Sequence, residues 1–269
     1  MTRPSKPATA ARIYDYFLGG THNFPADREA AKGILAMFPQ TRLGAQINRA
    51  FMRRAVRYLC DAGVTQFLDI GSGIPTEGNV HEIAQEADPQ VRVVYVDIDP
   101  VAVSESQELL EGNEFAVAIQ GDARDPKSIV EHPLVGKVID FEQPVAVLLV
   151  ALLHFVNDDD EARSILRRLV EVMAPGSYLV LSHGADEIVP DLPSEDVERL
   201  HEIYKRQTAT SLRLRTRAQI EGFFEGLEIV EPGIVWLPDW RPAPDDPPLA
   251  ADDTIRYGSL GGIGKLTSK

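Results

Sequence analysis

From residue 64 onward the chain alternates between two patterns of hydrophobic and polar positions. Short apolar runs rich in β-branched residues are typical of strands buried on both faces, and apolar residues that recur every three or four positions are typical of amphipathic helices. Their alternation predicts a parallel sheet with helices on both faces. The predicted strands are TQFLDI, VRVVYVDI, FAVAIQ, PVAVLLVALL and SYLVLSH, and the predicted helices cover residues 79–87, 100–110, 126–131 and 159–173.

Different patterns flank this region. On the N-terminal side, residues 27–38 are predicted to form a short helix, and a longer amphipathic helix follows and ends before Gly63. On the C-terminal side we expect helices over residues 191–210 and 216–224, then two extended runs divided by Pro232 and Gly233. The stretch RPAPDDPPLAADD is predicted to be a loop, and TIRYGSLGGIGKL to add a last edge strand.

These elements predict an α/β fold of the Rossmann-like, doubly wound kind, with a mostly parallel sheet. The chain has 269 residues, of which 44% are hydrophobic, and this is enough to bury one substantial core. We predict a disordered tail over residues 1–10, an N-terminal helical extension or lid over residues 11–63, and one α/β domain over residues 64–269.

Composition and charge narrow the possible partners. The net charge of −14 argues against binding to nucleic acid, which requires a basic face for the phosphates. Cys60 is the only cysteine, so an internal disulfide and a metal site of paired cysteines are excluded, and no metal is predicted. The longest apolar stretch, which begins at Pro144, is shorter than the roughly 20 residues of a membrane helix. With no apolar run at the N-terminus, we expect a cytoplasmic protein without membrane association.

Glycine and acidic residues follow three consecutive predicted strands. The glycine-rich turn DIGSG, residues 69–73, can bring the backbone close to a ligand. Asp97 ends the next strand, where an acid can accept hydrogen bonds from both hydroxyls of a ribose, whereas Asp99 is expected to cap the following helix. After the third strand, Asp122 can accept a hydrogen bond from an adenine amino group and Ala123 can offer a backbone N–H, or the two can form an ordinary turn. Together the three turns predict a nucleoside site.

In this order and at these strand ends, the motifs resemble those of class I S-adenosylmethionine-dependent methyltransferases. Asp69 resembles the acid of their first motif, Gly71 and Gly73 its glycines, and Asp97 and Asp122 the ribose and adenine acids. The sequence departs from the motif at positions 74–75, Ile-Pro, where many members have another glycine. The β-rich tail after five β/α units is similar to the end of their seven-stranded sheet.

The chain resembles one bacterial family of S-adenosyl methyltransferases more closely still. The resemblance extends from about residue 11 to residue 265 and rests on five segments: ARIYDYFLGGTHNFPADREAA, INRAFMRRAVRYL, QFLDIGSGIPTEGNVHEIA, YVDIDP and YGSLGGIGK. It implies that the domain over residues 64–269 is a class I methyltransferase-like domain and that S-adenosylmethionine is the cofactor. The expected cofactor-binding residues are Tyr14, Asn23, Arg53, Asp69, Gly71, Ser72, Gly73, Asp97, Ile98, Gly121, Asp122, Ala123, Ala151 and His154.

Three residues are candidates for catalysis. His154 lies just past the fourth predicted strand and His183 just past the fifth, and either can act as a general base because histidine titrates near neutral pH. The structural alternatives are a His154 ring that only packs over the cofactor and a His183 bonded to the backbone of its loop. Tyr16, in the N-terminal extension, is the third candidate.

The aromatic segment RIYDYFLGGTHNF suggests a lid. Its adjacent glycines at positions 19–20 can turn the chain sharply. We hypothesise that Tyr14, Tyr16, His22 and Asn23 cover the methionine end of the cofactor and shape the acceptor pocket. The alternative is that this segment simply packs the extension onto the core.

Arginines and acids form further clusters. Arg53 or Arg49 could capture the methionine carboxylate or an acidic acceptor in bidentate geometry, or the basic helix face is simply solvated. The alternating set Arg213, Arg215 and Arg217 has the same two interpretations. The run over residues 157–160, NDDD, is expected to cap the helix that follows.

The predicted function is transfer of a methyl group from S-adenosylmethionine to an unidentified, small-molecule acceptor. A general base is needed only if the acceptor is protonated at neutral pH. One alternative is a non-catalytic, S-adenosylmethionine-binding regulatory protein, which would use the same contacts. Another is a nicotinamide-dependent reductase, against which the missing third glycine argues, since Thr76 stands in its place. The sequence does not identify the acceptor, the methylated atom or the oligomeric state.

Overall fold

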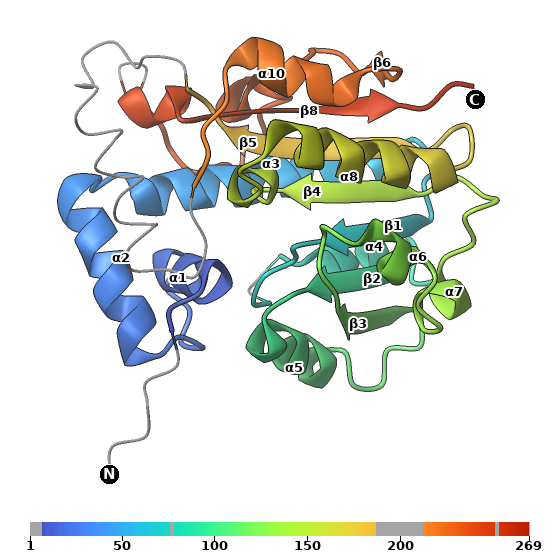
Figure 1. Cartoon of the computed structure of the whole chain (residues 1–269), viewed down its shortest axis with the longest axis horizontal. Helices are drawn as coiled ribbons and strands as arrows, with labels where there is room; N and C mark the ends of the chain where they lie inside the picture. Colours follow the sequence, from blue (N-terminus) through green and yellow to red (C-terminus); the bar gives the residue numbers. More distant parts are fainter. Residues whose placement is uncertain (1–6, 76–77, 187–211, 251–252, 269) are drawn as a thin grey trace.

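The computed structural model describes residues 7–75, 78–186, 212–250 and 253–268. Its centre is one mixed sheet with helices on both faces (Figure 1). The strand order is β3-β2-β1-β4-β5-β8-β6, and β7 also pairs with β8. Five parallel strands form the first part of the sheet: β1 Gln66–Ile70, β2 Arg92–Asp97, β3 Ala116–Gln120, β4 Ala146–Val150 and β5 Tyr178–Gly184. The Rossmann-like prediction is confirmed, but the sheet has eight strands and not the seven expected.

The last strand is the main difference from the sequence prediction. β8 Ser259–Lys265 was expected at an edge, but it lies inside the sheet, antiparallel to β5 on one side and to β6 Glu228–Ile229 and β7 Val235–Trp236 on the other. Leu260 and Ile263 are fully buried, as an interior strand requires. A Cβ atom on Gly261 would lie 2.6 Å from a Leu237 methyl group, so the glycines of this strand permit the close packing around it.

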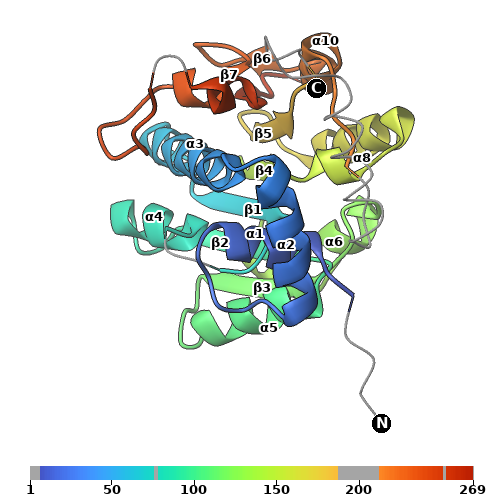
Figure 2. The ribbon, with the colours of Figure 1, turned by 90° about the vertical axis from the view of Figure 1, so that its left-hand side faces the viewer.

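Helices cover the two faces of the sheet (Figure 2), and a hydrophobic cluster fills the space on each face. One contains α6 Pro126–Val130, α7 Val135–Val138, α8 Asp159–Val172, α10 Arg217–Glu221 and η2 Gly222–Phe224. The other contains α3 Thr41–Asp61, α4 Val80–Ala87 and η3 Leu237–Asp239, and α5 Pro100–Leu109 lies beside β2 and β3.

The predicted helices are therefore present wherever the structure describes the chain. The helix expected over residues 191–210 lies outside the described residues. Asp99 and Asp158 cap α5 and α8 as expected, since each side chain accepts a backbone N–H of the first turn. Gly63 follows α3 with φ +85°, a conformation that suits glycine after a helix. No helix among the described residues is long and apolar enough to span a membrane.

The N-terminal extension stands in front of the carboxyl ends of the parallel strands (Figures 1 and 2). It consists of α1 Ala10–Phe17, α2 Pro25–Met37 and the first part of α3. Residues 1–6 of the predicted disordered tail lie outside the described residues. The prediction does not hold for residues 7–10, because Ala8 is buried and Thr9 caps α1.

A buried ionic cluster, the clasp, attaches this extension to the sheet. The clasp consists of Thr9, Arg12, Asp27 and Asp99. Arg12 donates to Asp27 over 2.9 Å and to Asp99 over 2.7 Å, and all three side chains are at least 96% buried. The Thr9 hydroxyl donates to Asp99 as well, and the Thr9 backbone N–H donates to Asp27. Because buried charges are stable only when paired, the clasp fixes α1 and α2 against the β2–α5 loop.

Candidate cofactor and acceptor site

A cavity of about 1670 Å³ lies at the carboxyl ends of the parallel strands. Its walls come from the loops after β1 to β5, from α1 and α3, and from η4 Thr254–Tyr257 just before β8. Ligands of open α/β sheets bind at this edge. The cavity exceeds the roughly 300–1,000 Å³ of a usual small-molecule site.

The loop after β1 is shaped for close approach of a ligand. Gly71 and Gly73 have φ of +76° and +69°, and a Cβ atom on Gly71 would lie 2.6 Å from a Leu152 methyl group. The backbone N–H groups of Gly71 and Ser72 both donate to the Val96 carbonyl, at 2.7 and 3.1 Å. These bonds hold the glycine turn beside the end of β2.

Asp97 organises the two turns. One carboxylate oxygen accepts the Gly73 N–H at 2.7 Å, and the other accepts the Asp99 N–H at 2.8 Å. Burial raises the pKa of Asp97, and these two backbone donors oppose the rise. Each carboxylate oxygen can accept a further hydrogen bond, so Asp97 lines the cavity as a fixed acceptor.

Asp69 and Arg49 form a second polar corner. Burial raises the pKa of Asp69 to about 7, with Arg49 opposing the rise and Asp97 adding to it. Arg49 projects from α3 to the same corner and donates to the Gly78 carbonyl over 3.1 Å. The sequence also suggested Arg53, but its side chain packs beside Gly78 and does not line the cavity among the described residues. Arg49 is therefore the arginine that faces the site.

The loops that follow β2 and β3 contribute both apolar and polar groups to the wall of the cavity. Gly121, Asp122 and Ala123 line the cavity as predicted. Arg124 donates to the Asp122 carboxylate over 2.7 Å, and this bond lowers the pKa of Asp122. The Ile98 side chain lines the same region and remains 54% exposed, so it offers an apolar surface to a ligand.

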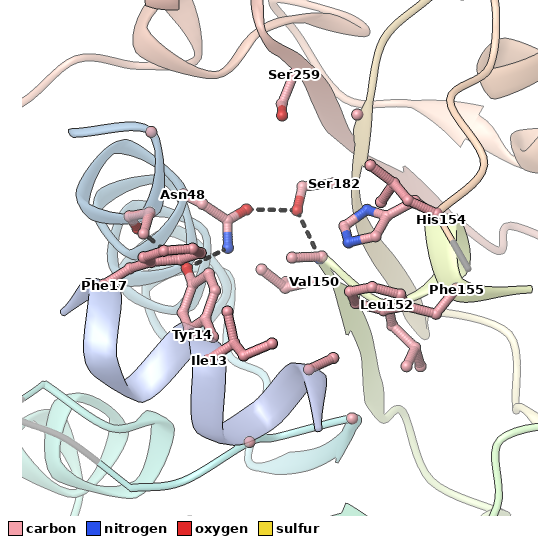
Figure 3. Close-up of a pocket in the computed structure, with 18 of the residues that line it drawn as sticks. Ile13, Tyr14, Phe17, Asn48, Val150, Leu152, His154, Phe155, Ser182 and Ser259 are labelled. Carbon is pink, nitrogen blue, oxygen red and sulfur yellow. Dashed lines mark hydrogen bonds between the residues drawn. The ribbon is translucent and has the colours of Figure 1, made fainter. Parts of the chain in front are cut away.

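His154 faces the cavity just after β4. The strand ends where Ala151 adopts φ +55°, and η1 Leu153–Phe155 follows. Figure 3 shows the His154 ring pointing into the cavity. Its Nδ1 is buried and has no hydrogen-bond partner within the described part of the chain. Burial, reinforced by His183 and Arg215, holds the pKa of His154 well below its usual value, so the ring is neutral at pH 7.

His183 has a different environment: it was expected just past the fifth strand, but it lies within β5, opposite Leu260 of β8. Arg215 donates to its Nε2 over 2.8 Å, which leaves the proton on Nδ1, and Nδ1 donates to the Gly184 carbonyl over 2.7 Å. Burial lowers the pKa of His183 to about 4. Since both ring nitrogens are already bonded, the geometry favours the structural alternative for this histidine.

Arg215 is a fully buried support for the loop that carries His154. Besides His183, it donates to the carbonyls of Leu153 and Val156, at 2.9 and 2.7 Å, and to Asp159 at 2.9 Å. From the sequence alone, this arginine was expected on a solvated face or in an anion site. The structure corrects that expectation, because every contact of Arg215 is internal.

Of the predicted lid residues, Tyr14 alone lines the cavity. Tyr14 and Tyr16 are two residues apart on α1, hence about 200° apart around the helix. The Tyr16 ring therefore faces away, beneath the Arg42 guanidinium at 4.9 Å. The Asn23 amide donates to Asp15 and the Gly20 carbonyl, and it stabilises the turn after α1. His22 lies 3.4 Å from Glu105, also away from the cavity. Tyr16 and Asn23 are thus not brought to the site.

Asn48 and Ser182 were missed as site residues. The Ser182 hydroxyl donates to Asn48 Oδ1 over 2.6 Å, and Asn48 Nδ2 donates to the Tyr14 hydroxyl over 3.0 Å (Figure 3). In the sequence, Asn48 belongs only to a basic helix stretch and Ser182 only to a predicted strand. No local signal could have found them, because 134 positions separate the two residues.

These residues fit a nucleoside with a charged tail. Asp97, the buried acid at the end of β2, suits a ribose. The glycine turn lets a ligand approach the backbone closely, and the Ile98 side chain offers an apolar surface for a flat base. The Asp69 and Arg49 corner suits an amino acid group, which carries one ammonium and one carboxylate. This donor set is the one that S-adenosylmethionine requires.

Comparisons with known proteins agree with this chemistry. The chain is similar to a candidate methyltransferase from Thermobifida fusca, with 38% identity over 98% of this chain and 96% of that one and a TM-score of 0.89. It is similar to a protein from Streptomyces avermitilis, of a domain family of unknown function, with 41% identity over 96% of this chain and 97% of that one and a TM-score of 0.88. An O-methyltransferase family protein from Burkholderia thailandensis shares the fold at 16% identity and a TM-score of 0.53, over 91% of this chain and 72% of that one.

Comparison with curated proteins gave no match. The model of a family described as S-adenosyl methyltransferase matches residues 3–267, which is nearly the whole chain. The protein therefore belongs to the S-adenosyl methyltransferase family, its cofactor is S-adenosylmethionine, and it is an S-adenosylmethionine-dependent methyltransferase.

Proposed function

We propose that the protein transfers the methyl group of S-adenosylmethionine to a small-molecule acceptor that binds in the same cavity. The observation that carries this proposal is the extent of the cavity. The cavity has a volume of about 1670 Å³. It extends from the corner at Gly71 and Asp97 to an apolar chamber between α1, α3 and η1. This volume has room for a second ligand beside the cofactor. The apolar chamber is lined by Ile13, Phe17, Ile47, Val150, Phe155 and Ile255.

The cofactor residues have separate parts in this proposal. Asp97 accepts hydrogen bonds from the ribose, and Asp122 and Ala123 bind the adenine edge beside Ile98. Arg49 binds the methionine carboxylate. When bound, S-adenosylmethionine supplies a methyl group that its sulfonium makes electrophilic. The protein aligns the acceptor with that group and excludes water.

His154 is the residue best placed to take a proton from the acceptor. Its neutral ring faces the chamber, and its Nε2 has no hydrogen-bond partner among the described residues, whereas Nδ1 is buried within the protein. His183 is not retained as a base, since Arg215 and Gly184 occupy both of its nitrogens. Tyr16 is not retained either, because it faces away from the cavity.

The charge and the cavity also bear on the alternatives. A net charge of −14 disfavours nucleic acid as the acceptor. A non-catalytic S-adenosylmethionine-binding protein would need the cofactor corner but not the second chamber, so the chamber favours an enzyme. The cytoplasmic location expected from the sequence stays a prediction.

Calorimetric titration with S-adenosylmethionine and S-adenosylhomocysteine tests the cofactor site. We expect micromolar binding by the natural protein and at least tenfold weaker binding by Asp97→Ala, which is a loss of about 1.4 kcal/mol. Asp88→Ala, which removes an exposed carboxylate remote from the cavity, is the matched control and should bind like the natural protein. No binding by folded natural protein would contradict the assignment of the cavity.

Transfer itself is tested with methyl-labelled cofactor and a library of small apolar compounds. A labelled product that His154→Phe fails to form would support the proposal. Cofactor binding without any labelled product would favour the regulatory alternative.

A further inference from the structure

A directed chain of hydrogen bonds runs along the wall of the apolar chamber (Figure 3). The Ala151 N–H donates to Ser182 Oγ at 2.9 Å, so the Ser182 hydroxyl hydrogen goes to Asn48 Oδ1. The Asn48 amide nitrogen then donates to the Tyr14 hydroxyl, which donates to the Ala45 carbonyl at 3.0 Å. Each hydroxyl hydrogen has one acceptor, and this fixes which end of the Asn48 amide faces Ser182. The second amide hydrogen of Asn48 has no partner among the described residues.

His154 lies across Ser182 from this amide, as Figure 3 shows. Whereas both nitrogens of His183 are bonded, the His154 ring makes no hydrogen bond within the described ranges. Nδ1 has almost no accessible surface, which leaves Nε2 as the nitrogen that a ligand in the chamber can reach. The chamber thus presents one hydrogen-bond donor, the Asn48 amide, and one acceptor, the neutral His154 ring.

The charges of the described residues disfavour a charged ligand at this position. Among the described residues, the cations that border the cavity are already engaged: Arg12 with Asp27 and Asp99, Arg124 with Asp122, and Arg256 with Asp239. Arg49 lies at the Asp69 corner, on the cofactor side. A carboxylate or an ammonium group would lose its water between Ile13, Phe17, Val150 and Phe155, and none of these four residues offers it an opposite charge.

We propose that the chamber selects an uncharged, largely apolar acceptor through one hydroxyl group, which donates to His154 and accepts from Asn48. A hydroxyl matches this pair because it is at once a donor and an acceptor. Aliphatic amines and carboxylic acids are charged at pH 7 and match less well. This inference rests on the proposed function, since it names the class of molecule that fills the second part of the same cavity.

The test is to measure, by calorimetry, the binding of four naphthalene probes to protein saturated with S-adenosylhomocysteine. The probes are 2-naphthol, 2-methylnaphthalene, 2-naphthoate and 2-naphthylmethylammonium, which share the ring system and differ in the polar group. We expect 2-naphthol to bind at least tenfold more tightly than each of the others. In His154→Phe the advantage of 2-naphthol over 2-methylnaphthalene should fall below threefold. His132→Phe, outside the cavity, should retain the full advantage.

Two controls separate the possible failures. The affinity for S-adenosylhomocysteine is measured on every variant. If the natural protein does not bind S-adenosylhomocysteine, the proposed function is contradicted. Normal S-adenosylhomocysteine binding with tighter binding of a charged probe, or with no probe bound, would overturn only the acceptor inference. The same holds if His154→Phe retains the full preference for 2-naphthol. If His154→Phe does not fold, Asn48→Leu replaces it and should reduce 2-naphthol affinity at least threefold.

Discussion

The histidine after β4 and the histidine within β5 show how the surroundings of a side chain decide its chemistry. His183 is buried and His154 is half-buried, and both are neutral. Arg215 and the Gly184 carbonyl bond both ring nitrogens of His183, whereas His154 turns toward the cavity. Their rings stand edge to face, with centroids 5.6 Å apart. Both residues line the cavity, but the nitrogens of His183 are already bonded, so His154 is the one with a nitrogen left for a ligand.

The depressed pKa of His183 makes the stability of the protein depend on pH. Its folded pKa of about 4 lies below the unfolded value, so the unfolded chain takes up the proton first as the pH falls. Its contribution to stability is complete above about pH 6.5 and is lost progressively toward pH 4. His183→Gln keeps an acceptor for Arg215 but does not titrate.

We expect the free energy of unfolding of the natural protein to fall by about 2 kcal/mol more than that of His183→Gln between pH 7.5 and pH 5. Urea unfolding at both pH values measures this difference. Because only the difference between the two proteins is used, the titration of groups that His183 does not influence, such as Asp69, cancels. Equal pH dependence in the two proteins would show that His183 is not buried as a neutral group.

Short elements and single buried arginines position the site. The 3₁₀ turn η1 has too few internal hydrogen bonds to hold His154 by itself, and Arg215 satisfies the carbonyls at both of its ends. Arg213 contributes a backbone N–H to the His154 carbonyl at 2.6 Å. The segment that carries these arginines thus fixes η1 against β5.

Arg215→Lys tests this support. One ammonium group cannot reach the two carbonyls, His183 and Asp159 together, and buried acceptors would remain unpaired. We expect a loss of about 1–3 kcal/mol in the free energy of unfolding, measured by urea denaturation.

Arg213→Lys is the matched control for this substitution. Arg213 bonds to the same Asp159, but its side chain is 45% exposed. The change should cost less than about 0.5 kcal/mol, because exposed ion pairs contribute little to stability. A similar loss in both variants would indicate that Arg215 has no special part in holding η1.

In the whole molecule, the N-terminal extension and the Rossmann-like sheet form one site only because the clasp joins them. Arg12 and Asp99 are 87 positions apart in the chain. Asp99 also donates its N–H to Asp97, the expected ribose acid. The clasp therefore couples the wall of the acceptor chamber to the cofactor corner.

Arg12→Met should cost about 3–5 kcal/mol of unfolding free energy, because it leaves the buried carboxylates of Asp27 and Asp99 without their cation. We also expect weaker S-adenosylhomocysteine binding, measured by calorimetry, since the position of Asp97 depends on the Asp99 backbone. Arg42→Met, at an exposed arginine over the Tyr16 ring, is the control and should cost at most about 1 kcal/mol. Loss of less than 1 kcal/mol in Arg12→Met would contradict the role of the clasp.

Local patterns in the sequence were enough to predict the parallel part of the sheet and the edge at which the cofactor is expected to bind. Apolar runs of strand length predict β1 to β5, and the residues at or near the carboxyl ends of these strands, such as Gly71, Asp97 and Asp122, must then meet at one edge. The helix caps at Asp99 and Asp158 were predictable for the same reason, since a cap depends on near neighbours in the chain.

Tertiary packing alone decided the rest. It selected Arg49 and not Arg53, Tyr14 and not Tyr16, and it placed β8 inside the sheet. Long-range contacts such as Ser182 with Asn48 and Arg12 with Asp99 carry no local signature, because each partner is an ordinary residue in its own segment. By itself the sequence determined the elements and the cofactor edge, because these follow from neighbouring residues. The acceptor chamber depends on how distant elements pack, and only the folded chain defines it.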